Sequence, residues 1–348
     1  MFLNPSKVKE CVETCLKARL VPFIQGSPGV GKSEIVKQIA DEYGLKLIDC
    51  RLSTMEPVDL NGIPWIQEGK AKFNPYDIFP LESTPIPQGY QGFLLFLDEF
   101  NSASRATQAA AYRVVLDREI GNHKLHPNCF VVAAGDKASD NAIVNRLSTA
   151  MLSRVIHFNM EVNFEDWRDN YAIPQGIDER IIAYLSMFPH KLMEFDPERE
   201  DQTFASPRTW SFASKLIKAN RDIVNKDIIP LLAGAITFEH ASAFVQFCKI
   251  YDDLITIDDI VANPDIEPPH DSATTWALII HLINRTNDEN YKAVFKFINK
   301  VSATFRVVYC RSIPVKHPNL VHDSEFIKCM QEMINYYGDL SECLGTKS

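Results

Sequence analysis

The sequence of 348 residues has no long hydrophobic run and no Cys-x-x-Cys pair. A membrane-spanning helix needs about 20 consecutive apolar residues, so we expect no membrane partner. The eight cysteines are scattered along the chain, and this distribution argues against both a zinc site and a disulfide framework. Charged side chains interrupt the first 20 residues, unlike the apolar core of a secretory signal. These features predict a cytoplasmic protein.

The sequence also lacks an excess of basic residues. It has 36 Lys and Arg against 45 Asp and Glu, a net charge of −9 at pH 7. No overall positive field therefore marks the chain as a nucleic-acid-binding protein, although an acidic ring can still enclose a small basic channel. What is present is an ordinary globular composition, 46% hydrophobic and 23% charged, with enough apolar material for two or three domains.

Short apolar segments alternate with helical patterns through the first 160 residues or so. This alternation is typical of a parallel sheet covered by helices. The expected strands span residues 21–25, 45–52, 93–97, 130–134 and 155–158, and the expected helices span 33–43 and 107–116. Two further segments, 63–73 and 118–125, have turn residues at their centres and predict β-hairpins. From residue 161 onward helical periodicity dominates.

The most specific motif fits G-x-x-x-x-G-K-[ST] in full and lies between an expected strand and an expected helix. Its glycines allow the loop to turn its backbone N–H groups toward phosphate oxygens, and the following helix adds its positive N-terminal end. The lysine is expected to contact the β- and γ-phosphates, and the serine hydroxyl to bind Mg²⁺. The motif consists of Gly26, Ser27, Pro28, Gly29, Val30, Gly31, Lys32 and Ser33.

A second motif is the apolar run 93–97 followed by Asp98 and Glu99. Such a run describes a buried parallel strand whose C-terminal end points at the ligand crevice of an α/β sheet. We expect Asp98 to hold Mg²⁺ through water and Glu99 to act as the general base on the attacking water. Together the two motifs predict an ATP hydrolase with ATP and Mg²⁺ as cofactors.

Over roughly residues 20–215 the chain resembles the MoxR-like AAA+ ATPases, which carry hairpins of the helix-2-insert type. The resemblance rests on the segments RLSTMEPVDLNGIP, LLFLDEFNSASRATQAAAYRVVLDREIG, FVVAAGDKASDNAIVNRLSTAMLSRVIHF and ASPRTW. It implies a hexameric, chaperone-like machine that remodels a macromolecular client, often with a von Willebrand A-domain partner on a separate chain. It also implies hairpin insertions after the second strand and before the fourth, where the two turn-centred segments lie.

The resulting prediction is an α/β fold with a P-loop AAA+ core, a helical lid and a helical C-terminal extension. We expect the core at residues 1–160, the lid at 161–250 and the extension at 251–348. Two other functions use the same core: a nucleic-acid-directed motor or loader, and an ATP-gated scaffold with little turnover. A metabolic P-loop kinase is disfavoured, because it leaves two arginines of the resemblance, Arg154 and Arg208, without a role.

Asp136 stands where the resemblance implies a polar residue that senses the γ-phosphate. Asparagine is commoner there, since an amide can donate a hydrogen bond to phosphate whereas a carboxylate only accepts one and repels the anion. Asp136 therefore has three open interpretations: it orients the lytic water, it leaves sensing to Lys137 or Asn141, or it is a turn residue after Gly135.

Two arginines complete the site that the resemblance implies. Arg154 precedes the fifth strand and is expected to act on a neighbouring subunit's nucleotide, with a surface salt bridge and Arg146 as the alternatives. Arg208 follows Ser206 and Pro207, which are a favourable N-cap and first helical residue. An arginine in a first helical turn opposes the helix dipole, a cost that a bound phosphate would reverse.

Other residues have simpler interpretations. Trp65, in the first predicted hairpin, is expected to pack against the sheet, with a client-gripping role as the alternative. His123 and His126 lack further ligands nearby in the sequence, so we expect structural roles and no metal.

Overall fold

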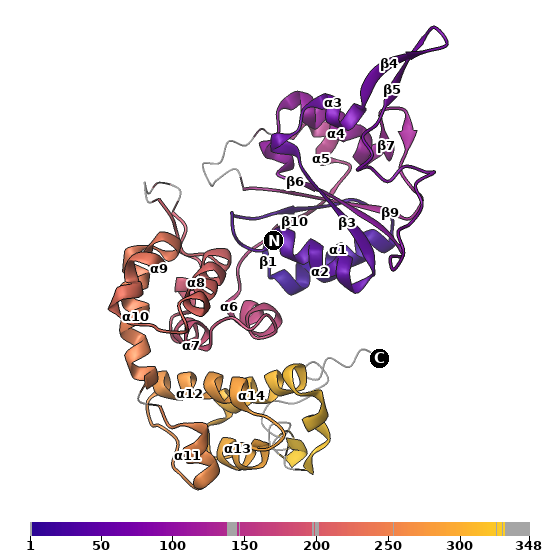
Figure 1. The fold of residues 1–348 in the computed structure, drawn as a ribbon. Helices are drawn as coiled ribbons and strands as arrows, with labels where there is room; N and C mark the ends of the chain where they lie inside the picture. Colours follow the sequence, from indigo (N-terminus) through magenta and orange to yellow (C-terminus); the bar gives the residue numbers. More distant parts are fainter. Residues whose placement is uncertain are drawn as a thin grey trace. The chain divides into compact units, whose positions relative to one another are not determined.

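The computed structural model describes residues 2–137, 145, 147–196, 198, 202–252, 254–324, 326–328 and 330. The chain divides into two compact units (Figure 1). The first comprises Met1–Asn163 with Asp196–Glu200, and the second comprises Phe164–Phe195 with Asp201–Ser348.

A six-stranded parallel sheet forms the centre of the first unit, in the order β1-β10-β2-β9-β6-β3. This sheet and its flanking helices confirm the predicted α/β fold class, and every expected strand is present. The sequence pattern missed β1, which has only two residues and pairs with the edge of β10. The strands are β1 Phe2–Leu3, β2 Pro22–Gln25, β3 Leu45–Arg51, β6 Gly92–Asp98, β9 Cys129–Gly135 and β10 Ile156–Met160.

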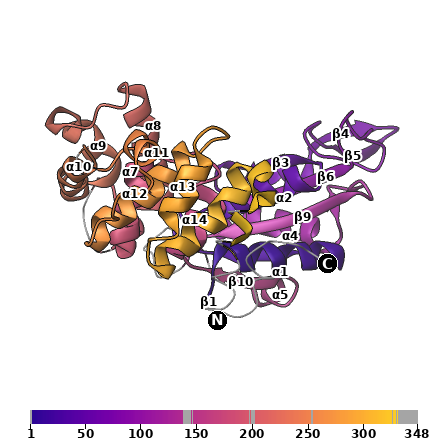
Figure 2. The same cartoon turned by 90° about the horizontal axis from the view of Figure 1, so that it is seen from below.

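Helices cover both faces of the sheet (Figures 1 and 2). Helices α1 (Pro5–Lys17) and α2 (Lys32–Glu42) lie on one face, and α4 (Arg105–Leu116) lies on the other. All seven residues of β6 are buried, because a central parallel strand has both of its faces covered. Alternate residues of β6 join the α4 side of the core with Phe23 and Val114. The short helices α3 (Pro57–Asn61) and α5 (Thr149–Leu152) complete the unit.

Both predicted hairpins are present. Strands β4 (Ile63–Gln67) and β5 (Lys70–Asn74) pair around Glu68 and Gly69, whose φ angles of 51° and 74° are those of a two-residue type I′ turn. Strands β7 (Glu119–Ile120) and β8 (His123–Lys124) pair likewise.

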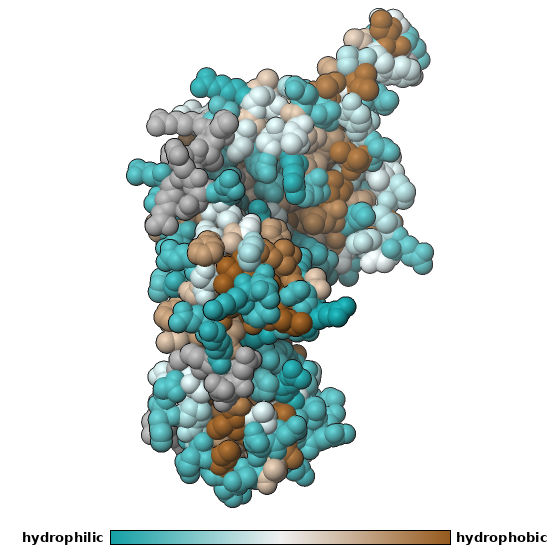
Figure 3. Space-filling view, turned by 60° about the vertical axis from the view of Figure 1, so that its left-hand side comes forward, coloured by the Kyte–Doolittle hydropathy of each residue, from teal (hydrophilic) through white to brown (hydrophobic). Residues whose placement is uncertain are grey.

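The β4–β5 hairpin projects away from the core in both cartoon views (Figures 1 and 2). Trp65 is 52% exposed and Ile66 is 77% exposed, so the expectation that Trp65 packs against the sheet was wrong. The reason is that the two-stranded ribbon extends outward, and neither of its faces at that point has a partner layer. Hydrophobic side chains are therefore visible on its surface (Figure 3).

The turn of the β7–β8 hairpin contacts the base of the β4–β5 hairpin. The ring of His123 forms a hydrogen bond with the backbone oxygen of Phe73, 3.0 Å away. A Cβ at Gly121 would overlap the backbone oxygen of Asn61, so only glycine permits this close approach. His126 instead accepts a hydrogen bond from the backbone N–H of Asn128. The two histidines thus make separate structural contacts.

The second unit is built from helices. Trp210 is fully buried in it and donates a hydrogen bond to the backbone oxygen of Lys191, 2.9 Å away. None of the described helices is both long and apolar enough to cross a membrane. The α-helices of this unit are α6 Phe164–Trp167, α7 Glu179–Met187, α8 Pro207–Ala219, α9 Ile229–Ile236, α10 Phe238–Asp252, α11 Ile257–Ala262, α12 Ser272–Arg285, α13 Tyr291–Ile298 and α14 Ala303–Lys316.

Candidate nucleotide-binding site

The glycine-rich loop connects β2 to α2 at the carboxyl edge of the sheet. Gly29 and Gly31 have φ angles of 82° and 105°, a region that side-chain-bearing residues rarely adopt. A Cβ at Gly26 would lie 3.0 Å from a methyl carbon of Val30 and 3.1 Å from the backbone oxygen of Met160. The loop thus needs glycine for its conformation at 29 and 31 and for close packing at 26. Such a loop at a helix N-terminus suits a phosphate group.

Lys32 is the first residue of α2 and is only 8% exposed. Its ammonium group lies 2.6 Å from the backbone oxygen of Gly26 and 3.2 Å from that of Ser27. It also pairs with the carboxylate of Asp136 at 2.8 Å. The lysine is therefore held inside the loop, where its charge is close to any phosphate bound by the backbone.

Ser33 and Asp98 meet although 65 positions separate them in the sequence. The Ser33 hydroxyl donates a hydrogen bond to Oδ2 of Asp98 at 2.9 Å. Asp98 is the last residue of β6 and is 8% exposed. A hydroxyl and a carboxylate are hard oxygen donors of the kind that Mg²⁺ prefers, and Mg²⁺ is often held by one or two carboxylates plus substrate phosphates. This donor set fits the predicted metal.

Glu99 has a left-handed backbone with a φ of 54°, an uncommon conformation for a residue with a side chain. Its carboxylate accepts a hydrogen bond from the hydroxyl of Ser53. The sequence analysis missed Ser53. The available signal was topological: β3 and β6 are parallel neighbours with Arg51 opposite Asp98, so residues just after both strands meet at one edge.

Asp136 directly follows β9, and Asn101 fixes its backbone. The Asn101 amide donates to the backbone oxygen of Asp136 at 2.7 Å, and its oxygen accepts the Asp136 N–H at 3.1 Å. A Cβ at Gly135 would overlap the Asn101 side chain, so the strand end and Asn101 fit closely. Asn101 is 2% exposed and was also missed by sequence analysis, because its partner is 35 positions away and follows another strand, β9.

The carboxyl edge of the sheet is acidic. Partial withdrawal from water raises the pKa of Asp49, and the neighbouring carboxylates of Asp98 and Glu99 raise it further against the opposing effect of Arg51. Lys137 does not share in the loop contacts; its ammonium lies 3.4 Å from Glu161. Among the described residues, Lys32 is the one that forms an ion pair with Asp136.

Arg154 lies near the amino ends of the strands, opposite the carboxyl edge that carries the glycine-rich loop. It precedes β10, whose first residue, Ile156, is opposite Pro22, whereas Asn159 is opposite Gln25. At about 3.3 Å per residue, the start of β10 is about 13 Å from the level of Gly26 along the strands, and Arg154 lies in the turn just before β10. Its guanidinium lies over the ring of Tyr112 with 5.6 Å between the carbon and the centroid.

Arg208 belongs to the second unit. As expected, Ser206 is the N-cap of α8, with its side chain accepting from the backbone of Thr209 at 3.2 Å, and Pro207 is the first helical residue. Arg208 is exposed in the first turn. The alternative candidates Asn141 and Arg146 lie outside the described residues.

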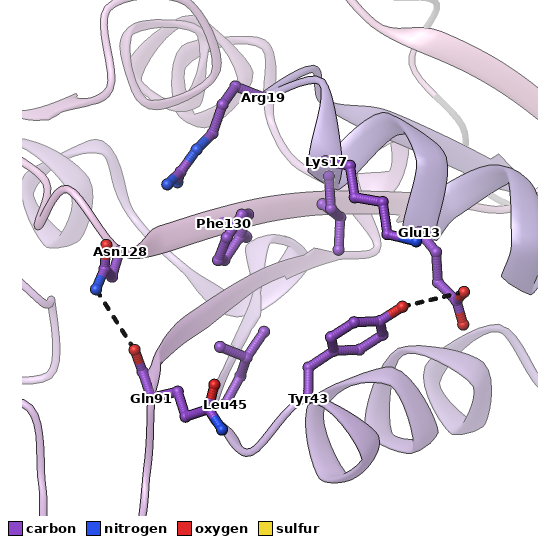
Figure 4. A pocket seen from close by; sticks show the side chains of 9 residues that line it. Glu13, Lys17, Arg19, Tyr43, Leu45, Gln91, Asn128 and Phe130 are labelled. Carbon is purple, nitrogen blue, oxygen red and sulfur yellow. Dashed lines mark hydrogen bonds between the residues drawn. The ribbon is translucent and has the colours of Figure 1, made fainter.

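A pocket of about 360 Å³ lies elsewhere in the first unit (Figure 4). It is located where β3 and β9 begin, next to the C-terminal part of α1, and is therefore distinct from the glycine-rich loop. Figure 4 shows the hydrogen bond between Tyr43 and Glu13 at one side of it. The lining residues are Glu13, Leu16, Lys17, Arg19, Tyr43, Leu45, Gln91, Asn128 and Phe130.

The model of the "ATPase family associated with various cellular activities (AAA)" matches residues 23–163. This segment is an AAA-family domain. The match begins within β2 and extends past β10, so it includes the loop, Asp98, Glu99, Asp136 and Arg154. No curated protein matches the sequence of the chain.

Several solved structures are similar to the chain at low identity. A point mutant of Thermotoga maritima RuvB is 15% identical with a TM-score of 0.37, over 76% of this chain and 84% of that one. A second point mutant of the same protein is 15% identical with a TM-score of 0.38, over 75% and 82%. A Cytophaga hutchinsonii protein assigned as an ATPase is 11% identical with a TM-score of 0.36, over 96% and 81%. Values this low say nothing about what the AAA domain acts on.

Proposed function

We propose that this protein is a Mg-ATP-hydrolysing AAA+ ATPase of the MoxR-like type that assembles as a ring and remodels a macromolecular client. One observation carries the proposal: the glycine-rich loop, Lys32, the Ser33–Asp98 pair and Glu99 come together at the carboxyl edge of the sheet. This set contains a phosphate cradle, oxygen donors for Mg²⁺ and a general base. Residues 161–250 serve as the lid in this proposal and 251–348 as an extension.

Each residue in the site has a defined task. The backbone N–H groups of the loop bind phosphate oxygens, and Lys32 adds a charge-assisted contact. Ser33 and Asp98 hold Mg²⁺, which, when bound, neutralises phosphate charge. Glu99 takes the proton of the attacking water. Its bond with Ser53 fixes the carboxylate beside β3 through Oε2, and the second carboxylate oxygen can accept from the attacking water.

Arg154 is proposed to serve the neighbouring subunit's site. The register of β10 with β2 puts the start of β10, just after Arg154, about 13 Å from the level of the glycine-rich loop, farther than an arginine side chain extends. A contact with nucleotide must then come from another copy, as in a ring with repeating head-to-tail interfaces. An arginine in that position stabilises the charge on the transferring phosphoryl group.

The β4–β5 hairpin is the proposed client or partner contact. Ile63, Trp65 and Ile66 are each more than half exposed, and exposed apolar residues on a projecting element are typical of interaction sites. Only the short helix α3 separates this hairpin in sequence from Ser53, whose hydroxyl donates a hydrogen bond to Glu99. A von Willebrand A-domain protein is the partner class that the resemblance suggests.

One observation favours a second candidate, an ATP-gated scaffold with little turnover. Asp136 forms an ion pair with Lys32, and Ser53 donates a hydrogen bond to Glu99. Two of the groups needed for hydrolysis therefore already have partners within the protein. A scaffold of this kind would bind ATP and release phosphate slowly.

The test compares nucleotide affinity and phosphate release in three variants. Glu99→Gln should bind ATP as the wild type does but lose hydrolysis, because an amide cannot accept the proton. Lys32→Ala should lose affinity for the nucleotide itself. The matched control is Glu82→Gln. Glu82 lies in the segment between β5 and β6, outside the glycine-rich loop, so its substitution should change neither the affinity nor the rate of phosphate release. Wild-type turnover by Glu99→Gln would eliminate the assigned base, and tight binding without turnover by the wild type would favour the scaffold.

A further inference from the structure

We propose that Asp136 is a specificity determinant that disfavours the triphosphate relative to the diphosphate by holding Lys32 in an ion pair. This inference rests on the proposed function of the site. Lys32 has three ammonium N–H donors, and three oxygens surround its nitrogen: those of Gly26, Ser27 and Asp136 at 2.6, 3.2 and 2.8 Å. A phosphate can therefore contact Lys32 only when one of these partners is released.

Hydrogen bonds to its backbone and low exposure to water fix the position of Asp136 beside Lys32. Its backbone is held on both sides by the 2%-exposed Asn101, and β9 before it is hydrogen-bonded to β2, with the Gly26 N–H donating to the Gly135 oxygen at 3.3 Å. The side chains of Lys32 and Asp136 are 9% and 21% exposed. Water screens so sheltered a pair only weakly.

The negative charge of the Asp136 carboxylate discriminates between the two nucleotides by electrostatic repulsion. The lysine of a glycine-rich loop contacts the β- and γ-phosphates, so a carboxylate bonded to its nitrogen lies beside the outermost phosphate. Asp98 is the last residue of the adjacent strand β6 and Glu99 follows it, so the triphosphate adds its extra negative charge where carboxylates already gather. The diphosphate does not carry that charge. An asparagine at 136 would remove the competitor for Lys32 and add a donor.

Equilibrium binding of a non-hydrolysable Mg-ATP analogue and of Mg-ADP tests the proposal without measuring catalysis. The comparison uses wild type, Asp136→Asn and Glu161→Gln. The last variant is the control, because it removes one negative charge from a neighbouring pair, Lys137 with Glu161, and leaves Lys32 untouched. We expect Asp136→Asn to tighten binding of the Mg-ATP analogue about tenfold and Mg-ADP binding much less, while Glu161→Gln changes the ratio of the two affinities little.

The outcomes separate this proposal from the proposed function. If the wild type binds both nucleotides and Asp136→Asn leaves their affinity ratio unchanged, or weakens ATP, the role of Asp136 is refuted while the ATPase proposal stands. If no variant binds either nucleotide, the ATPase proposal fails first and this one fails with it.

A second measurement uses the unmodified protein and remains decisive if Asp136→Asn does not fold. Experimental structures would be determined without nucleotide, with Mg-ADP, and with a non-hydrolysable Mg-ATP analogue. We expect the Lys32–Asp136 ion pair without nucleotide and its separation beyond about 4 Å, the usual limit of an ion pair, with the analogue. An intact pair in the analogue complex, or no pair in the nucleotide-free protein, would overturn the proposal.

Discussion

Mixing two inactive variants, Arg154→Ala and Glu99→Gln, should restore part of the ATPase activity. The perturbation follows from the sheet register, which puts the start of β10, just after Arg154, about 13 Å from the glycine-rich loop along the strands. Each variant alone should lose activity by about 10³-fold or more, since an arginine that completes a neighbour's site contributes on that scale. In a mixed ring, a subunit with intact Glu99 can lie next to one with intact Arg154.

The size of the rescue can be worked out. With equal amounts and random assembly, the Arg154→Ala subunit supplies Glu99 at half of the positions, and a Glu99→Gln neighbour supplies the arginine with probability one half. About a quarter of the interfaces are then complete, so about a quarter of wild-type activity is the upper limit for independently acting sites in a closed ring.

The assay is steady-state phosphate release over a series of mixing ratios, with mixed rings verified by native mass spectrometry. Activity should peak at equal amounts and fall to zero at both ends. A matched control is Arg113→Ala mixed with Glu99→Gln. Arg113 forms an ion pair with Glu119 inside its own unit, so Arg113→Ala should be active alone and show no peak. Inactivity of verified Arg154→Ala/Glu99→Gln rings at every ratio would refute the shared site.

Three further predictions concern other parts of the molecule. Gly31→Ala should weaken nucleotide binding and lower stability by about 1–2 kcal/mol, because residue 31 has a φ of 105°; an unchanged melting temperature and affinity would contradict this. Burial raises the pKa of Cys50 to about 12 and that of Cys129 to about 11, so both thiols stay protonated at pH 8 and should resist alkylation until the protein unfolds, as peptide mass mapping can show. Trp65→Ala should leave the basal ATPase rate and the melting temperature nearly unchanged, since Trp65 is 52% exposed, but should reduce partner-stimulated turnover; a large loss of stability would show that the residue is structural.

Local sequence patterns were sufficient for the central strands and for the phosphate loop. The run 93–97 is apolar at every position, and a continuous apolar run of strand length with turn residues around it suits burial on both faces of a sheet. The loop was predictable because Gly29 and Gly31 are needed for its local conformation and Gly26 for its close approach to Val30, and all of these residues lie within eight consecutive positions. The cap of α8 by Ser206 was predictable for the same reason, since it involves residues only three positions apart.

Only the tertiary structure decided which side chains share the site and which do not. Ser53 reaches Glu99, and Asn101 holds Asp136, because parallel strands distant in the sequence end at the same edge of the sheet. The two-residue strand β1 exists through its pairing with β10, since so short a segment has no periodicity to detect. Trp65 is exposed because no layer covers its hairpin, a fact about surrounding elements that the residue's own hydrophobicity cannot convey. Local conformation depends on residues close together in the sequence, whereas contacts between distant segments depend on the order of the strands in the sheet. Lys32 pairs with Asp136 because β2 and β9 are adjacent in that order.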